Sequence, residues 1–170
     1  MVVVIGASIL IFLLRDQAEV LARYGYPGIF LLSILANATI ILPAPGILFV
    51  FAMGAVFNPL IIAVCAGAGA AIGELFGYLI GVSGRGVVEN STRYNQIFSW
   101  MKNHRRWNYL FIFLLAFIPN PLFDLAGVAA GTLKIPVLSF LIFTFLGKTL
   151  KMILIAFAGA YSLDRLLEIF

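Results

Sequence analysis

Four ionisable side chains lie within long apolar runs of this sequence: Glu74, Asp124, Lys148 and Lys151. A charged group at membrane depth is costly unless it is paired or in contact with water. Lys148 and Lys151 are one helical turn apart, and the two acids are the partners available to them in the apolar runs. Such a set can contact a polar headgroup or carry a proton. As alternatives, Glu74 forms a purely structural contact and Asp124 lies near a membrane interface.

A helix-breaking motif occurs twice. Pro119 and Pro121 remove two backbone donors and, with Asn120 between them, stop a continuous helix. The same Pro-x-Pro pattern is found at Pro43 and Pro45. Broken backbone at membrane depth is tolerated where protein or a water-filled cavity surrounds it. The motifs therefore predict two re-entrant hairpins that line a polar pathway, and the alternative is a Pro-kinked spanning helix.

Composition indicates an all-α integral membrane protein. Hydrophobic residues make up 63% of the 170 residues, charged residues make up 11%, and the mean hydropathy is +1.10. The net charge of +4 lies in the segment 84–108, which places five basic residues against Glu89. A basic loop between apolar blocks is typical of the cytoplasmic side and not of nucleic-acid binding. Cys65 and His104 are single residues of their kind, so we expect no metal site and no cofactor.

We expect one membrane domain over residues 1–170. Its predicted parts are an N-terminal helix (1–23), a first unit (24–83), a basic cytoplasmic segment (84–107) and a second unit (108–161). Each unit combines a re-entrant hairpin with one transmembrane helix, so each crosses the membrane once and the second is inverted relative to the first. Apolar residues at helical spacing and two tryptophans predict an interfacial amphipathic helix in the basic segment. Pro27-Gly28 predicts a turn at the start of the first unit.

Small residues form a stripe on the predicted helix 60–81. Its members are four residues apart and share one face: Gly69, Gly73, Gly77 and Gly81. Such a stripe allows close approach of another helix, and a homo-oligomer is one state that it permits. Glu74 lies beside this stripe. Asn37, which precedes the first Pro-x-Pro motif, is expected in the same polar groove.

Two segments of the chain resemble a known family. The run Ile118-Pro-Asn-Pro-Leu-Phe-Asp-Leu-Ala-Gly127, followed by Pro136, Gly147-Lys-Thr149 and Lys151, is similar to the VTT domain of the DedA superfamily (SNARE-associated Golgi protein-like). The motif is nearest to that of vacuole membrane protein 1. The glycine-rich run Gly73-Glu-Leu-Phe-Gly-Tyr-Leu-Ile-Gly81 resembles a second segment of that superfamily.

The resemblance implies opposed re-entrant hairpins and movement of lipids across bilayers. Phospholipid scrambling is known from the eukaryotic branch, and proton-dependent translocation of undecaprenyl phosphate from the bacterial branch. The chain departs from the bacterial pattern at two places. Ala36-Asn37 stands where an acid is usual, and Ala116 and Leu122 stand where arginines are usual. These departures favour the scramblase-like branch.

We therefore expect a lipid scramblase or translocase and not an enzyme, because no nucleophile, His–acid pair or metal set is apparent. Its partners would be membrane lipids, and its location the plasma (inner) membrane of a prokaryote as a multi-pass protein. One alternative is a proton- or ion-coupled secondary transporter, for example of a polyprenyl phosphate. Another is a membrane scaffold that associates through the glycine stripe.

Overall fold

The described part of the chain consists of helices and short connections. The computed structural model describes residues 18–38, 46–84, 92–120 and 122–167, and side chains between Gly25 and Ser162 within these ranges. The helices are α2 (Ala18–Ala38), α3 (Gly46–Val56), α4 (Pro59–Gly73), α5 (Leu75–Val82), α6 (Thr92–Asn103), the short 3-10 turn η1 (Arg105–Trp107), α7 (Asn108–Phe117), α8 (Leu122–Thr132) and α9 (Val137–Leu167).

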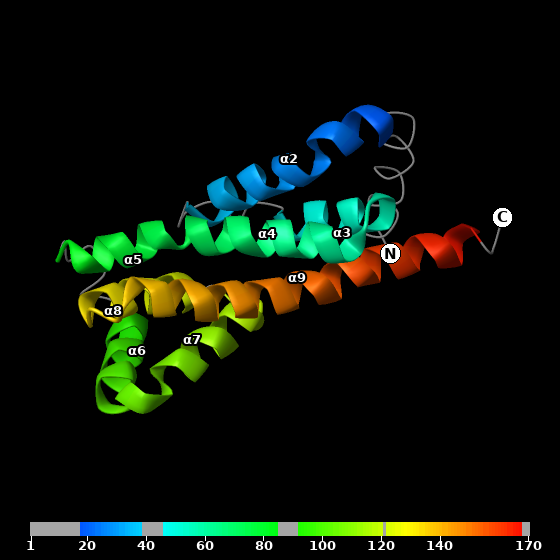
Figure 1. The fold of residues 1–170 in the computed structure, drawn as a ribbon. Coiled ribbons are helices and arrows are strands. Elements are labelled where there is room, and N and C mark those ends of the chain that lie inside the picture. The colour runs from blue at the N-terminus through cyan, green and yellow to red at the C-terminus, as the bar shows by residue number, and fades with distance from the viewer. Residues whose placement is uncertain (1–17, 39–45, 85–91, 121, 168–170) are drawn as a thin grey trace.

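Two apolar helical stretches are long enough to cross a membrane, judged by length and composition. They are Pro59–Val82, which joins α4 to α5, and Val137–Ser162 in α9. In Figure 1 these stretches run alongside each other in opposite directions and form the axis of the structure. The remaining helices pack around this axis, with α2 and α3 towards one end and α7 and α8 towards the other.

The helices that flank each Pro-x-Pro motif make crossed contacts. The helices before the two motifs, α2 and α7, are the first arms. Helix α2 packs on α4 and α7 packs on α9, so each first arm lies against the long helix of its own half. The helices after the two motifs, α3 and α8, are the second arms. They lie mainly against the long helix of the other half, since α3 packs on α9 and α8 packs on α5. Each half of the chain therefore places one helix against the long helix of the other half.

Glycines permit the closest of these crossed contacts. A Cβ atom added at Gly54 in α3 would lie 2.6 Å from the Cα atom of Ala156 in α9. One added at Gly131 in α8 would lie 2.9 Å from the backbone nitrogen of Val82 in α5. Because real Cβ atoms are not found at such distances from backbone, residues with a side chain could not be accommodated without moving the helices apart.

The buried apolar residues form two separate clusters. One cluster includes Ile29, Val50, Ile62, Met152 and Ala156, from α2, α3, α4 and α9. The other includes Tyr78, Met101, Ile112, Phe123 and Phe140, from α5 to α9. On α9 the polar residues Thr144, Lys148, Thr149 and Lys151 lie between the parts that join the two clusters, and on the first long helix the one polar residue between them is Glu74.

The basic segment forms an amphipathic helix, as its periodicity predicts. Helix α6 buries Tyr94, Ile97 and Met101 against α8, and its basic side chains are exposed. Trp100 and Trp107 are also exposed. In Figure 1, α6 runs across the direction of the long helices, at the end of the structure where α5 ends and α9 begins.

One local prediction is wrong. No turn forms at Pro27-Gly28, because α2 passes through Pro27 without ending. Pro27 is exposed, and the packing of α2 on α4 outweighs the intrinsic cost of a proline within a helix. The predicted helix 60–81 is present as the stretch Pro59–Val82, with the single residue Glu74 between α4 and α5.

The connection from α8 to α9 is a Schellman turn. The N–H group of Ile135 donates to the carbonyl of Ala130, and the N–H group of Lys134 donates to the carbonyl of Gly131. This places Lys134 in the left-handed region, with φ at 53°. Glycine is the usual residue at this position, and a residue with a side chain costs on the order of 1 kcal/mol there.

Candidate functional site

A buried ion pair joins the two long helices. Lys148 Nζ in α9 lies 2.5 Å from Glu74 Oε1 at the junction of α4 and α5. Glu74 is 2% exposed and Lys148 is 6% exposed. Each charge is thus withdrawn from the surroundings and compensated mainly by the other, because an unpaired charge in this position would be expensive.

Asn37 completes the coordination of Lys148. The Nζ atom donates a second hydrogen bond of 2.8 Å to Asn37 Oδ1, and the Asn37 amide nitrogen donates to the carbonyl of Ser33 in α2. The ring of Phe123 in α8 lies beneath the same ammonium group, with its centroid 4.8 Å from Nζ, which is suitable for a cation–π interaction. One lysine therefore connects α2, the α4–α5 junction and α8.

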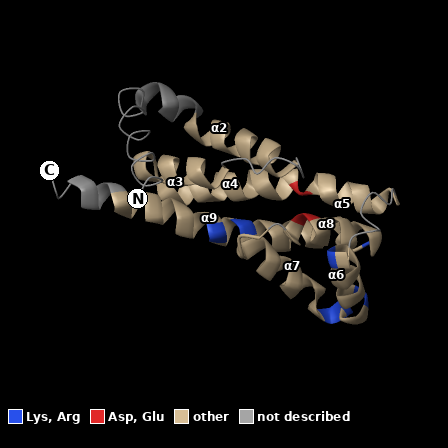
Figure 2. Cartoon of the chain, turned by 180° about the vertical axis from the view of Figure 1, so that it is seen from behind, with Lys and Arg blue, Asp and Glu red and all other residues tan. Residues whose placement is uncertain are grey.

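Asp124 and Lys151 lie at the edge of this cluster. Asp124 is in the first turn of α8, where the helix dipole favours an acid. Both residues are partly buried and interact electrostatically with the Glu74–Lys148 pair. Figure 2 shows the two acids, one between α4 and α5 and the other on α8, near the lysines of α9.

The backbone continues in a helical direction through Glu74. Glu74 has φ of −65° and ψ of −15°, so it ends α4 and precedes α5 while keeping a nearly helical direction. Its backbone N–H group donates to the carbonyl of Ala70, and its carbonyl accepts from Tyr78. The backbone at this break is therefore hydrogen-bonded.

The described part of the second Pro-x-Pro motif forms a tight turn. Pro119 is exposed at the turn between α7 and α8. The Asn120 amide nitrogen donates to the carbonyls of Leu115 and Ile118, and its oxygen accepts from the N–H group of Leu122. The Asn120 side chain thus serves to hold the turn. Pro43, Pro45 and Pro121 lie outside the described residues.

The glycine stripe contacts two helices. A Cβ atom at Gly73 would lie 2.6 Å from the Ile34 carbonyl oxygen, and Gly69 is equally close to α2. Gly81 instead faces α8, where an added Cβ atom would lie 2.9 Å from the nitrogen of Thr132. Gly77 also faces α8, but an added Cβ atom would be at an ordinary distance of 3.6 Å from the Asp124 carbonyl oxygen. All four glycines are buried within the single chain.

Two buried hydroxyl groups of α9, on either side of Lys148 in the sequence, were not predicted from the sequence. Thr144 is fully buried one turn before Lys148, Thr149 directly follows it, and the Oγ1 atoms of both threonines lack a hydrogen-bond partner within the described structure. Thr149 packs against Gly67 of α4. The spacing of Thr144 and Lys148 on one helix face was a usable signal, but threonines are common in apolar helices and do not stand out there.

The described residues contain no group of three or more His, Cys, Asp or Glu side chains suited to hold a metal ion. What the geometry defines is an all-helical protein with two apolar helices of membrane-spanning length and an ion pair buried between them. These features describe a polytopic membrane protein of the transporter type.

Comparison with known proteins gives the family. Residues 42–161 match the model of the VTT domain, so the chain belongs to the VTT-domain family of membrane proteins. It is 38% identical over 100 residues to vacuole membrane protein KMS2 of Arabidopsis thaliana, a match that covers 49% of this chain and 24% of that protein. It is 35% identical over 103 residues to vacuole membrane protein KMS1, covering 49% and 25%. The matches thus span about a quarter of each relative's length. No solved structure matches the chain.

Proposed function

We propose that this protein is a lipid scramblase or translocase that moves phospholipid headgroups through a polar groove near the membrane midplane. The observation that carries the proposal is the buried polar cluster of Glu74, Lys148 and Asn37, which lies between two apolar clusters on the long helices. A structural ion pair is replaceable by apolar residues of similar volume, often at no loss of stability. A cluster of two opposite charges and an amide suits the substitution of a headgroup's water shell.

We further propose that both helical hairpins are re-entrant and that the two units are inverted in the membrane. The crossed packing supports this, because α3 contacts α9 in the same manner as α8 contacts α5. The glycine contacts repeat as well, with Gly54 against α9 and Gly131 against α5. In such an arrangement the two Pro-x-Pro turns approach from opposite faces, and the polar groove lies between their tips.

In the proposed mechanism the acyl chains remain in the bilayer while the headgroup passes the polar cluster. The phosphate would approach Lys148 and Lys151, and the donor groups of the headgroup would approach Glu74, Asp124 and Asn37. No covalent step is needed, so we propose that the protein is not an enzyme. Its proposed location is the plasma (inner) membrane of a prokaryote.

A coupled secondary transporter is the second candidate. The observation that favours it is the direct contact between Glu74 and Lys148 together with the electrostatic interaction of both with Asp124 and Lys151. Protonation of one acid would release a lysine, which could then bind an anionic substrate. In this mechanism Glu74 or Asp124 carries the coupled proton.

Reconstitution into liposomes separates the two candidates. Fluorescent phosphatidylcholine, phosphatidylethanolamine and phosphatidylglycerol are each placed in both leaflets, and an impermeant reductant bleaches the outer leaflet. Scrambling predicts complete bleaching of several lipids without a pH gradient. Coupled transport predicts movement that depends on the gradient and favours one lipid. Bleaching of only the outer half under all conditions would overturn both.

Asp124→Asn tests the pathway assignment in the same assay. The change preserves shape and removes charge, so the protein should fold normally while lipid movement slows by at least about tenfold, as expected for loss of a buried charge–charge interaction. Leu79→Met, at an exposed apolar position, is the matched control and should leave the rate unchanged. An unchanged rate in Asp124→Asn would reduce Asp124 to a residue that stabilises the start of α8.

A further inference from the structure

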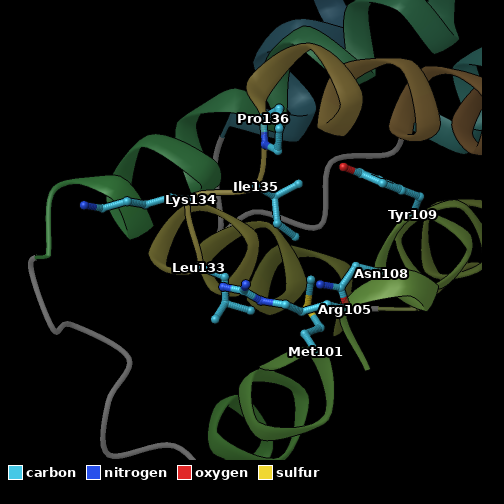
Figure 3. A pocket seen from close by; sticks show the side chains of 8 residues that line it. All are labelled: Met101, Arg105, Asn108, Tyr109, Leu133, Lys134, Ile135 and Pro136. Atoms are coloured by element: carbon cyan, nitrogen blue, oxygen red, sulfur yellow. The ribbon is translucent and has the colours of Figure 1, made fainter. Parts of the chain in front are cut away.

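A pocket lined by both polar and apolar residues lies at the basic end of the molecule, apart from the Glu74–Lys148 site. It has a volume of about 280 Å³ and is formed by α6, η1, the start of α7 and the α8–α9 turn. Its walls are shown in Figure 3 and consist of Met101, Arg105, Asn108, Tyr109, Leu133, Lys134, Ile135 and Pro136. This volume corresponds to roughly nine water molecules, which is enough for a phosphate with a short polar substituent.

Asn108 lines the pocket and carries a buried acceptor that has no hydrogen-bond partner. The residue is 5% exposed, and its Oδ1 atom has no hydrogen-bond partner. A buried amide oxygen without a partner is unfavourable, so it is suited to a ligand that brings a donor group. In Figure 3 the Asn108 amide lies beside the Arg105 side chain. An acceptor and a guanidinium group thus line the same cavity.

The positive charges of the pocket suit a phosphate. Arg105 can bind two phosphate oxygens at once, and its guanidinium group extends along the wall formed by Leu133. Lys134 belongs to the rim, and its ammonium group points outward in Figure 3. Lys134 occupies the left-handed position of the Schellman turn, where glycine would be favoured. The backbone conformation therefore does not explain why a lysine is found at this position.

The surroundings of the pocket indicate a lipid rather than a soluble phosphate ester. Trp100 and Trp107 are exposed on the adjoining helices, and tryptophans favour the level of the headgroups. Leu110 of α7 and Val137 and Leu138 of α9 directly follow pocket residues in the chain and are exposed. These apolar surfaces could contact acyl chains while a headgroup occupies the pocket.

We propose that this pocket binds a glycerophospholipid whose headgroup carries an N–H or O–H donor, with the phosphate on Arg105 and the donor on Asn108 Oδ1. Ethanolamine, serine and glycerol headgroups meet this requirement, and choline does not, because its nitrogen has no hydrogen. The assignment deepens the proposed function by naming a site where a lipid is captured before transport. Binding is measured separately from transport, so either can fail alone.

The test is lipid binding to the full chain in detergent, measured by native mass spectrometry and by thermal shift. Phosphatidylethanolamine and phosphatidylglycerol should bind about tenfold more tightly than phosphatidylcholine of the same acyl chains, the ratio expected for one good hydrogen bond to a buried acceptor. Asn108→Leu should abolish this difference, and Asn103→Leu, an exposed control on α6, should keep it. Asn108→Gln retains a neutral amide acceptor and should keep most of the difference, which covers the case in which Asn108→Leu does not fold.

Arg105 and Lys134 are tested with variants that separate binding from folding. Arg105→Gln should weaken binding of all three lipids about tenfold, whereas Lys102→Gln on exposed α6 should have little effect. Lys134→Gly should raise the melting temperature, because glycine suits the left-handed position, and should change lipid binding little, because the Lys134 ammonium group points away from the pocket.

Three results would overturn the assignment. The first is equal affinity of the wild-type protein for all three lipids. The second is a preference that persists unchanged in Asn108→Leu. The third is competition by soluble phosphoethanolamine or glycerol 3-phosphate at the same concentration as the lipids, since this would indicate a site for soluble phosphate esters.

Discussion

Lys148 determines the chemistry of the site at the residue scale. It contacts Glu74, Asn37 and the ring of Phe123, and so connects three elements through one ammonium group. Removing the lysine leaves a buried carboxylate and a buried amide oxygen without their common donor. The energetic consequence should therefore be larger than the loss of a single hydrogen bond.

A double-mutant cycle on Glu74 and Lys148 measures this coupling. Lys148→Met alone should lower the free energy of unfolding by about 3–5 kcal/mol, because it leaves Glu74 unpaired. Adding Glu74→Gln should recover part of that loss and give a coupling energy of at least about 1 kcal/mol. Denaturant unfolding in detergent provides the values. Strictly additive effects would show that the two side chains are not partners in solution.

Two glycines of the stripe offer a second test at this scale. Gly81→Ala should destabilise the protein by roughly 1–3 kcal/mol, because the new methyl group would collide with the backbone of α8. Gly77→Ala should be neutral or stabilising by up to about 1 kcal/mol, since its methyl group meets an ordinary contact and alanine favours a helix. Melting temperatures in detergent distinguish the two, and equal values would contradict the packing of α5 on α8.

At the scale of elements, helix ends are fixed by specific side chains. Asn58 is the N-cap of α4, and its oxygen accepts from the N–H groups of Leu60 and Ile61. Pro59 follows at the first helical position, where a missing N–H group costs nothing. The chain thus leaves α3 and starts the first long helix within two residues.

Loss of this cap should be measurable. Asn58→Ala removes the acceptor and should cost about 1 kcal/mol of stability, whereas Asn58→Asp retains an acceptor and should cost much less. Thermal unfolding of the three proteins in detergent is the comparison. If Asn58→Ala and Asn58→Asp melt at the same temperature, the cap does not hold the start of α4.

The elements also show how far the sequence alone could lead. Periodicity identified α6, and proline spacing predicted the separation of α7 from α8, because both signals are local. Pro27 was misleading, since the packing of α2 on α4 outweighs its local preference. The charged residues were recognisable by their rarity in apolar runs. Which of the two acids pairs with Lys148 could not be recognised from the sequence, because the pairing depends on how the long helices are rotated relative to each other.

At the scale of the whole molecule, the two halves depend on each other. Helix α3 packs mainly on α9 and α8 packs mainly on α5, so each half covers one helix of the other half. Two fragments divided between α5 and α6 should therefore be unstable alone but associate when they are produced together. Co-purification of a tagged first fragment with an untagged second fragment is the measurement. A stable, monodisperse first fragment without its partner would contradict this dependence.

The crossed packing also has a consequence for the order of synthesis. Helix α3 ends at Val56, and its partner α9 begins at Val137. At roughly 5–20 residues per second, several seconds separate the appearance of these helices from the ribosome. During that time α3 can contact α2 and α4, but the face that contains Gly54 has not met α9. Membrane insertion of this protein should therefore depend on a factor that shields the first hairpin until translation is almost complete.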